Sequence, residues 1–329
     1  MTRKPQWITS LPLLIGLLSL LLSACSSPAT GAPPAGPGTT VLTLPSSQTP
    51  TTSTPTRVQV IQLLLQSAQA MSAVKSVHLL ATSSGTLLSA NGALPALNQQ
   101  QSIPYRLKLS SDVDLATQQQ QGHLQLSLSP AGQPPIALNI MEVLAGQKLF
   151  SSNAAATKNT TATTASGWMV MDLARLVTMG QVAEASNLAQ NLLPLLAQQV
   201  AATDHGIITL AGVQVRHVTL VLSQQALTQI AAQANQPQVK PFLQSIQLQT
   251  PLTLDVFINP ASSLVQQVSV KGHITVNVDQ LTGGNTAQTN AQARTLQVAM
   301  KGTTITFTQY NQPVQIRVPA TRGTPVPLG

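Results

Sequence analysis

The residue with the clearest chemical assignment is Cys25, the only cysteine in the chain. It follows an apolar stretch, Leu11–Ala24, which Arg3 and Lys4 precede. A basic start, a short apolar core and small residues at the exit are typical of a secretory signal peptide. The four residues that end at Cys25, Leu-Ser-Ala-Cys, match the lipobox that the lipoprotein signal peptidase reads. The sequence therefore predicts that residues 1–24 are removed and that the Cys25 sulfur carries a diacylglycerol.

Two alternatives to lipidation are a plain signal peptide beside an unrelated cysteine and a transmembrane anchor. The apolar run is shorter than the about 20 residues that a membrane-spanning helix needs. Lipidation also accounts for a lone cysteine at the one position that it requires. Because each buried methylene contributes about 0.8 kcal/mol, two or three acyl chains such as palmitate hold a protein firmly at a membrane. We expect a protein anchored to the outer, extracytoplasmic face of the bacterial cell membrane.

Other residues that could do chemistry are few and poorly spaced. No Gly-x-Ser-x-Gly nucleophile elbow occurs. Among eight acidic residues, Asp112 and Asp114 form the one close pair, and two positions apart on a strand they share a face. A solvated strand explains that pair better than an acid/base pair does. The five histidines show no metal-ligand spacing; they are His78, His123, His205, His217 and His273.

These observations predict a protein that is not an enzyme and that has no catalytic residue, metal site or cofactor. An outward-facing hydrolase is the remaining catalytic alternative. Loss of residues 1–24 lowers the formal net charge from +8 to about +6, and aromatic residues make up 2% of the chain. Nucleic-acid binding needs basic clusters and stacking aromatics, so we expect no nucleic-acid partner. A mild positive charge instead favours proximity to anionic lipid head groups.

The composition divides the mature chain into a linker and a domain. Residues 25–56 hold the lipidated cysteine followed by Ser, Thr, Pro, Gly and Ala, which cannot bury enough apolar area to order the chain. We expect this segment to be a disordered linker. Residues 57–320 are long enough for a single domain with a substantial core. Residues 321–329 read as a frayed tail.

Periodicity predicts helices at the start and in the middle of the domain. After a cap at Thr54 and a proline at Pro55, glutamines mark the wet side of a first helix and apolar residues mark the dry side. The middle of the chain predicts short helices over residues 172–180, 181–203 and 223–234, the last one capped by Ser223. The apolar residues of the first helix are Ile61, Leu64, Leu65, Ala68 and Met71.

Elsewhere apolar and polar residues alternate with a period of two, which is typical of antiparallel strands with one dry and one wet face. Short turn signals, such as Ala211-Gly212, Asn259-Pro260 and Lys301-Gly302, separate the runs. Because the dry face and the apolar helices must cover each other, we predict an α+β fold. It is a strongly curved antiparallel sheet, or half-barrel, with helices on its concave face. The alternating runs lie at 106–109, 123–128, 252–258, 274–278, 296–300, 305–307 and 314–318.

The order of these elements resembles the LppX/LprAFG lipoprotein family. The likeness rests on the lipobox and linker and on short motifs along nearly the whole domain. The first helix leads into Met-Ser-Ala-Val-Lys-Ser-Val-His, and Gly-Gln-Lys-Leu-Phe is followed after an insert by Gly-Trp-Met-Val-Met-Asp. These and two later motifs occupy residues 71–78, 146–150, 167–172, 212–219 and 307–314.

The resemblance implies a half-barrel like that of the LolA/LolB carriers, with an acylated lipid or glycolipid in an apolar cavity. It implies a lipoprotein that carries this lipid across the cell envelope, with an envelope transporter or acceptor protein as a partner. The alternative is a non-catalytic cell-surface binding or structural lipoprotein with a filled core. On the first reading, the residues expected to line the cavity are Leu64, Leu65, Met71, Leu192, Leu193, Leu196, Val218, Leu220, Leu254, Val256, Val268 and Val270.

Overall fold

The computed structural model describes most of the predicted domain, namely residues 57–90, 102–117, 119–145, 148–153, 168–172, 200–233, 239–277, 279 and 294–319. Several expectations lie outside these residues. They concern the signal peptide 1–24, Cys25 and the linker 25–56, the tail 321–329, and Leu192, Leu193 and Leu196.

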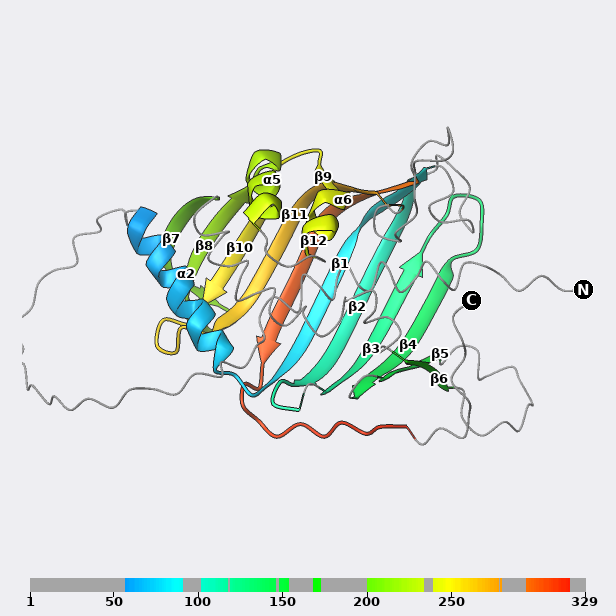
Figure 1. The fold of residues 1–329 in the computed structure, drawn as a ribbon, viewed down its shortest axis with the longest axis horizontal. Coiled ribbons are helices and arrows are strands. Elements are labelled where there is room, and N and C mark those ends of the chain that lie inside the picture. Colours follow the sequence, from blue (N-terminus) through cyan, green and yellow to red (C-terminus); the bar gives the residue numbers. More distant parts are fainter. Residues whose placement is uncertain are drawn as a thin grey trace, which may run out of the picture.

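All strands of the described residues form one twelve-stranded antiparallel sheet (Figure 1). The strands run β6-β5-β4-β3-β2-β1-β12-β11-β10-β8-β7 across the sheet, and β9 pairs with β11. The path has two free ends, at β6 and β7, so the described sheet is an open half-barrel, as predicted. The strands are β1 (Ser76–Ala90), β2 (Ser102–Asp114), β3 (Gln119–Leu128), β4 (Ile136–Ala145), β5 (Lys148–Asn153), β6 (Trp168–Asp172), β7 (Ala201–Leu210), β8 (Val213–Leu222), β9 (Ile246–Leu248), β10 (Leu252–Ile258), β11 (Val265–Asn277) and β12 (Thr295–Thr308).

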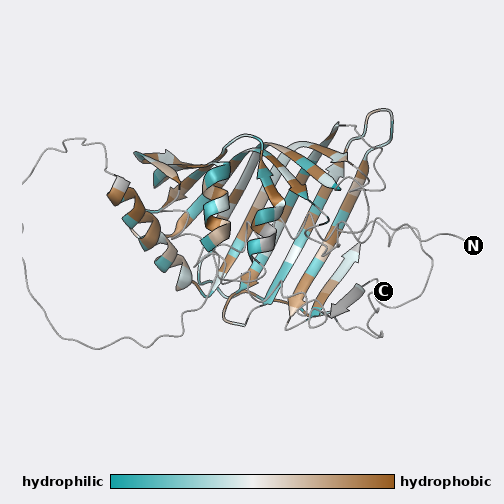
Figure 2. Ribbon diagram, turned by 45° about the horizontal axis from the view of Figure 1, so that its top comes forward, coloured by the Kyte–Doolittle hydropathy of each residue, from teal (hydrophilic) through white to brown (hydrophobic). Residues whose placement is uncertain are grey.

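Three described helices lie on the concave face of the sheet: α2 (Arg57–Ser72), α5 (Gln224–Gln233) and α6 (Val239–Ser245). Figure 2 shows them over the half of the sheet that contains β7 to β12. The predicted cap of α5 is confirmed, because the Ser223 hydroxyl accepts a hydrogen bond from the Ala226 amide at 3.2 Å. The fold class predicted from the alternation is therefore correct.

The helix α2 turns one narrow stripe toward the sheet. Val60, Leu64, Ser67 and Met71 are buried, at spacings of three and four residues. The glutamines on the opposite side are exposed, as predicted. Leu65 departs from the prediction, since it is 41% exposed. A helix turns about 100° per residue, so the neighbour of buried Leu64 lies on the flank of the helix.

Lys301 and Gly302 do not form the predicted turn. They lie inside the single strand β12, where Ser84 pairs with Gly302 and Gly85 with Met300, which leaves Lys301 as an extra residue. This β-bulge shifts the phase of the alternation. Even-numbered residues face the helices up to Met300, and odd-numbered residues do so from Thr303 onward. The shift in the apolar alternation at Lys301-Gly302 therefore reflects a β-bulge inside one strand and not the predicted turn between two strands.

Three further predictions are wrong or incomplete. The helix expected over 181–203 cannot reach its predicted end, because β7 begins at Ala201. The alternating residues 314–318 belong to no strand of the described sheet. That segment instead follows the ends of β1 to β3, and the Arg317 amide donates a hydrogen bond to the Gln121 side chain at 3.0 Å. The strands β1, β4, β7 and β9 were not predicted.

No described helix has both the length and the apolar character that a membrane-crossing helix requires.

The bulge gives a direct test of the fold. A Cβ atom on Gly85 would lie 1.9 Å from the Ala299 carbonyl oxygen and 3.0 Å from the Tyr105 ring, whereas one on Gly302 would meet nothing within 4 Å. We predict that Gly85→Ala lowers the free energy of unfolding by about 1–3 kcal/mol. Gly302→Ala should change it by less than about 0.5 kcal/mol. Urea denaturation of both variants checks this, and equal effects would contradict the register at the bulge.

Candidate functional site

The candidate site is the concave face of the sheet, defined as the side that carries the helices. Cross-strand pairing arranges its residues in rows. One row runs through Val218, Val256, Val268, Ile305 and Ala81. The next row starts Leu220, Leu254, Val270 and continues onto β12, β1, β2 and β3. The face is thus a mainly aliphatic surface, and a single hydrophobic cluster joins it to the three helices.

The structure brings most of the expected cavity residues onto this face. Leu64 and Met71 are buried under α2. Six sheet residues lie in two adjacent rows, with Leu254 and Val268 half-buried and the other four buried. Leu65 does not join them, as described above. The sheet residues are Val218, Leu220, Leu254, Val256, Val268 and Val270.

Charged groups lie toward both ends of the concave face. On β7 and β8, the Asp204 side chain is fully buried and accepts hydrogen bonds from the Arg216 guanidinium at 2.7 Å and from the Gly206 amide at 2.7 Å. Toward the other end, Glu142 on β4 pairs with Gly122 on β3. Gly122 has the same phase as the concave residues Leu124 and Leu126, so Glu142 faces the concave side. Burial raises the pKa of the Glu142 carboxyl. The middle of the face, between these groups, carries no charged residue in the described strands β1, β10, β11 and β12.

Three hydroxyl groups interrupt the aliphatic surface at its centre, and sequence reasoning missed them. The Ser83 hydroxyl lies 3.0 Å from the Tyr105 hydroxyl and 2.6 Å from the Thr303 hydroxyl. We call Tyr105, Ser83 and Thr303 the hydroxyl triad. They come from the adjacent strands β2, β1 and β12, and all three side chains are buried. The sequence held one signal for them. Each occupies a position where the alternation of its strand calls for an apolar, concave-facing residue.

Another buried hydroxyl belongs to α2. Ser67 is 3% exposed and lies between Leu64 and Met71 on the stripe that faces the sheet. Its Oγ atom has no hydrogen-bond partner among the described residues. A buried hydroxyl without a partner costs about 1–3 kcal/mol, so this position is not optimised for stability alone.

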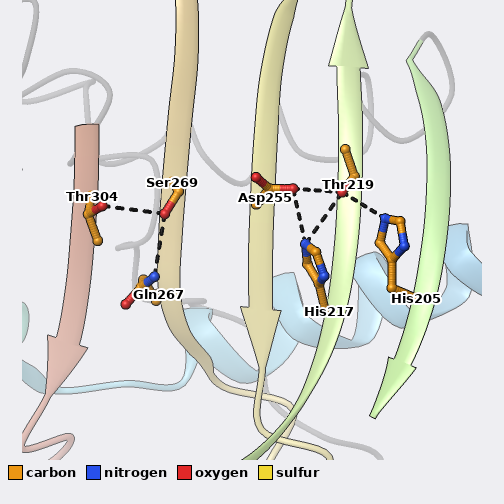
Figure 3. Close-up of polar contacts among 7 residues, drawn as sticks. All are labelled: His205, His217, Thr219, Asp255, Gln267, Ser269 and Thr304. Carbon is orange, nitrogen blue, oxygen red and sulfur yellow. Dashed lines mark hydrogen bonds and ion pairs between the residues drawn. The ribbon is translucent and has the colours of Figure 1, made fainter. Parts of the chain in front are cut away.

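The opposite, convex face is more polar. Figure 3 shows a cluster of His205, His217, Thr219 and Asp255, from β7, β8 and β10. Asp255 accepts hydrogen bonds from the Thr219 hydroxyl at 2.6 Å and from His217 Nε2 at 3.0 Å. The rings of His205 and His217 stack at 4.5 Å, and Phe257 stacks on His217 at 4.7 Å.

This cluster contains the residue types of a catalytic triad but not its geometry. In a triad, the carboxylate holds one ring nitrogen of the histidine and the nucleophile uses the other. Here the same nitrogen, His217 Nε2, faces both Asp255 and Thr219, and the Thr219 hydroxyl donates directly to the carboxylate. The histidine therefore cannot pass a proton from the threonine to a second site. The arrangement fits a structural role in joining three strands.

The remaining candidates for chemistry have structural partners as well. Asp112 pairs with His78 at 2.6 Å, and Asp114 accepts hydrogen bonds from the Ala116 and Thr117 amides, which closes the turn after β2. Within the described residues, no group of three His, Cys, Asp or Glu side chains is placed to hold a metal ion. The other two histidines bond to neighbouring side chains, His123 to Asn139 and His273 to Thr250.

Asp255 generates a prediction on pH. Burial alone would raise the pKa of its carboxyl, but the hydrogen bonds from Thr219 and His217 and the positive charges of His217 and Lys271 outweigh burial and lower the pKa below its usual value. A lowered pKa in the folded state contributes stability that is present above the unfolded pKa, about 3.9. That stability is lost as the pH falls through the folded pKa.

We therefore predict that Asp255→Asn lowers the free energy of unfolding by about 1 kcal/mol at neutral pH and that the difference from wild type disappears toward about pH 2. Denaturant titrations at a series of pH values measure it. A difference between the two proteins that stays constant with pH would contradict this account of Asp255.

Some solved structures resemble this chain at low sequence identity. No protein-family model matches the chain, and no curated protein matches it. Solved structures do: lipoprotein LppX of Mycobacterium tuberculosis is 12% identical, with a TM-score of 0.39, and the match covers 79% of this chain and 99% of LppX. LprF of Mycobacterium bovis is 14% identical, with a TM-score of 0.41, over 82% of this chain and 100% of LprF. The matches found by structure thus include the LppX/LprAFG lipoproteins, which the sequence motifs resemble.

Proposed function

We propose that this protein is a lipoprotein that binds an acylated lipid on its concave face and carries it across the cell envelope. Cys25 anchors it at the outer face of the cell membrane, and the linker 25–56 lets the domain reach away from the bilayer. One observation carries the proposal: the mainly aliphatic face that runs across the open sheet from β8 to β3.

The described helices are too small to cover that face. The eleven strands of the path lie about 4.8 Å apart, so the sheet measures about 50 Å across its strands. The helices α2, α5 and α6 have 16, 10 and 7 residues. At about 1.5 Å per residue and about 10 Å in width, they cover a minor part of the sheet. The concave residues beyond these helices, such as Leu107 and Leu124, are nevertheless 5% and 2% exposed. An acyl chain bound there would therefore replace part of the cover that these side chains already have, and we assign that exchange to ligand binding.

The chemistry of the face suits acyl chains. Leu, Val, Ile and Ala dominate it, and Tyr105 and Phe307 are the aromatic residues of its buried cluster. A chain of about 16 carbons that leaves water gains on the order of 12 kcal/mol gross, at about 0.8 kcal/mol per methylene. Such a surface discriminates weakly between chain lengths, since one methylene is worth only about 1–3 kcal/mol. An envelope transporter or acceptor protein would then receive the lipid.

The first test is direct. Residues 25–329 with Cys25→Ala, exported behind a cleavable signal peptide and purified without detergent, should retain a lipid at close to one molecule per protein. Mass spectrometry under native conditions and after solvent extraction measures the complex and identifies the lipid. A protein that is folded and free of lipid would contradict the proposal and favour the alternative of a surface lipoprotein with a filled core.

Two neighbouring residues of α2 give a matched pair. Leu64 is 4% exposed and faces the sheet, whereas Leu65 is 41% exposed. We predict that Leu64→Trp fills space on the concave side and lowers the amount of retained lipid several-fold, and that Leu65→Trp leaves it unchanged. Thermal unfolding of both variants separates lost lipid from lost fold. Equal lipid contents in two folded variants would place the ligand away from α2.

A further inference from the structure

The hydroxyl triad lies where an acyl chain on the concave face would cross it. Strands β2, β1 and β12 occupy the centre of the sheet. In register, Ser83 lies between Thr303 on β12 and Leu107 on β2, and Thr303 lies beside Val270 on β11. The three side chains are 2–6% exposed. A small polar group is therefore enclosed in an otherwise aliphatic surface.

The triad has one more proton than it can use internally. Each hydroxyl carries a single proton, and each hydrogen bond consumes one. The two bonds of the triad, Tyr105 to Ser83 and Ser83 to Thr303, use two of the three protons. Burial raises the pKa of the Tyr105 phenol, so this hydroxyl keeps its proton. Among the described residues, these hydroxyls have no further hydrogen-bond partner, so one donor remains unused.

The missing partner must be an uncharged acceptor. The cross-strand neighbours of the triad offer no acceptor in their side chains; they are Leu107 and Val270 beside Ser83 and Thr303, and Gly85 and Leu128 beside Tyr105. A buried donor without an acceptor costs about 1–3 kcal/mol. A carboxylate would suit the site poorly, because burying a charge without a cation costs far more. The one arginine on this face of β8, Arg216, is already bonded to Asp204. An ester carbonyl supplies an acceptor without a charge.

We propose that the hydroxyl triad is a polar subsite that donates a hydrogen bond to the ester carbonyl of the bound lipid. This inference rests on the proposed function and adds a specificity to it. The concave face should prefer ester-linked acyl chains to ether-linked alkyl chains of the same length and to free fatty acids. Ser67, the buried hydroxyl of α2 that has no partner among the described residues, is not needed for this preference.

A purely structural role for the triad makes different predictions. If the hydroxyls only hold three strands in register beside the bulge, their removal should lower stability and leave lipid preference unchanged. Replacing all partners of a buried hydrogen-bonded group by apolar groups of the same shape is often neutral. The combined variant Tyr105→Phe, Ser83→Ala, Thr303→Val is therefore the informative one. Tyr105→Phe or Thr303→Val alone leaves a pair of hydroxyls with one unused proton, and Ser83→Ala alone leaves two separate hydroxyls that each have an unused proton.

The test is a competition between two lipids. Residues 25–329 with Cys25→Ala are incubated with phosphatidylcholine vesicles that contain equal amounts of dipalmitoylglycerol and dihexadecylglycerol, its diether analogue, and the bound lipids are counted by mass spectrometry. We expect wild type to favour the ester by about 3- to 10-fold, the value of one hydrogen bond. The combined variant should bind both lipids in a ratio near one. The matched control, Thr82→Val with Thr304→Val, removes two paired hydroxyls of the convex face and should keep the preference.

A second measurement needs no variant. The infrared carbonyl band of bound dipalmitoylglycerol, labelled with carbon-13 at the ester carbons, should lie at lower frequency than in hexane if a hydroxyl donates to it. Equal binding of the two lipids by wild type, a preference that survives in the folded combined variant, or an unshifted carbonyl band would each overturn the subsite and leave the lipid carrier standing. If wild type bound neither lipid, both proposals would fail.

Discussion

The alternation of side chains in an antiparallel sheet is the constraint on which this structure depends. Every residue that faces the helices is followed by one that faces the other way, so a single phase decides which groups share the concave surface. Eleven paired strands keep that phase in common. In β12 the apolar residues change from even to odd positions, and the β-bulge at Lys301 keeps both sets on the concave face. Without the bulge, Ile305 and Phe307 would face the convex side and the aliphatic surface would end at β12.

The two faces of the sheet consequently separate two kinds of interaction. On the convex face, polar side chains bond along and across strands, as in the cluster of Asp255, Thr219 and His217. These contacts use every histidine of the described chain and leave no nucleophile and base in catalytic geometry. On the concave face, the polar groups of the described residues are few, and they include Asp204 with Arg216, Glu142, the hydroxyl triad, Ser67, Ser89 and Ser111. This separation is what a surface for acyl chains requires, and it gives the few polar groups on that face their importance.

The sequence predicted the elements whose alternation is undisturbed. The strands β10 and β11 and the capped helix α5 were found from pattern alone, because their dry positions hold Val, Ile and Leu. The strand β1 was missed for a physical reason: its concave positions include Ser83, Gly85 and Ser89, which weaken the alternation. The strand β7 was missed because a bulge near His205 and Gly206 breaks its period. The hydroxyl triad could not be predicted, since it joins residues 22 and 220 positions apart that only the register brings together.

The central claim is that an acyl chain lies on the concave face. Photocrosslinking tests it most directly, with a diacylglycerol that carries a diazirine midway along one chain and with peptide mapping of the products. The account predicts crosslinks to concave residues of β8, β10, β11 and β12, such as Leu220, Leu254 and Val270. Crosslinks confined to exposed apolar residues of the convex face, such as Leu80 on β1 and Val221 on β8, would contradict it.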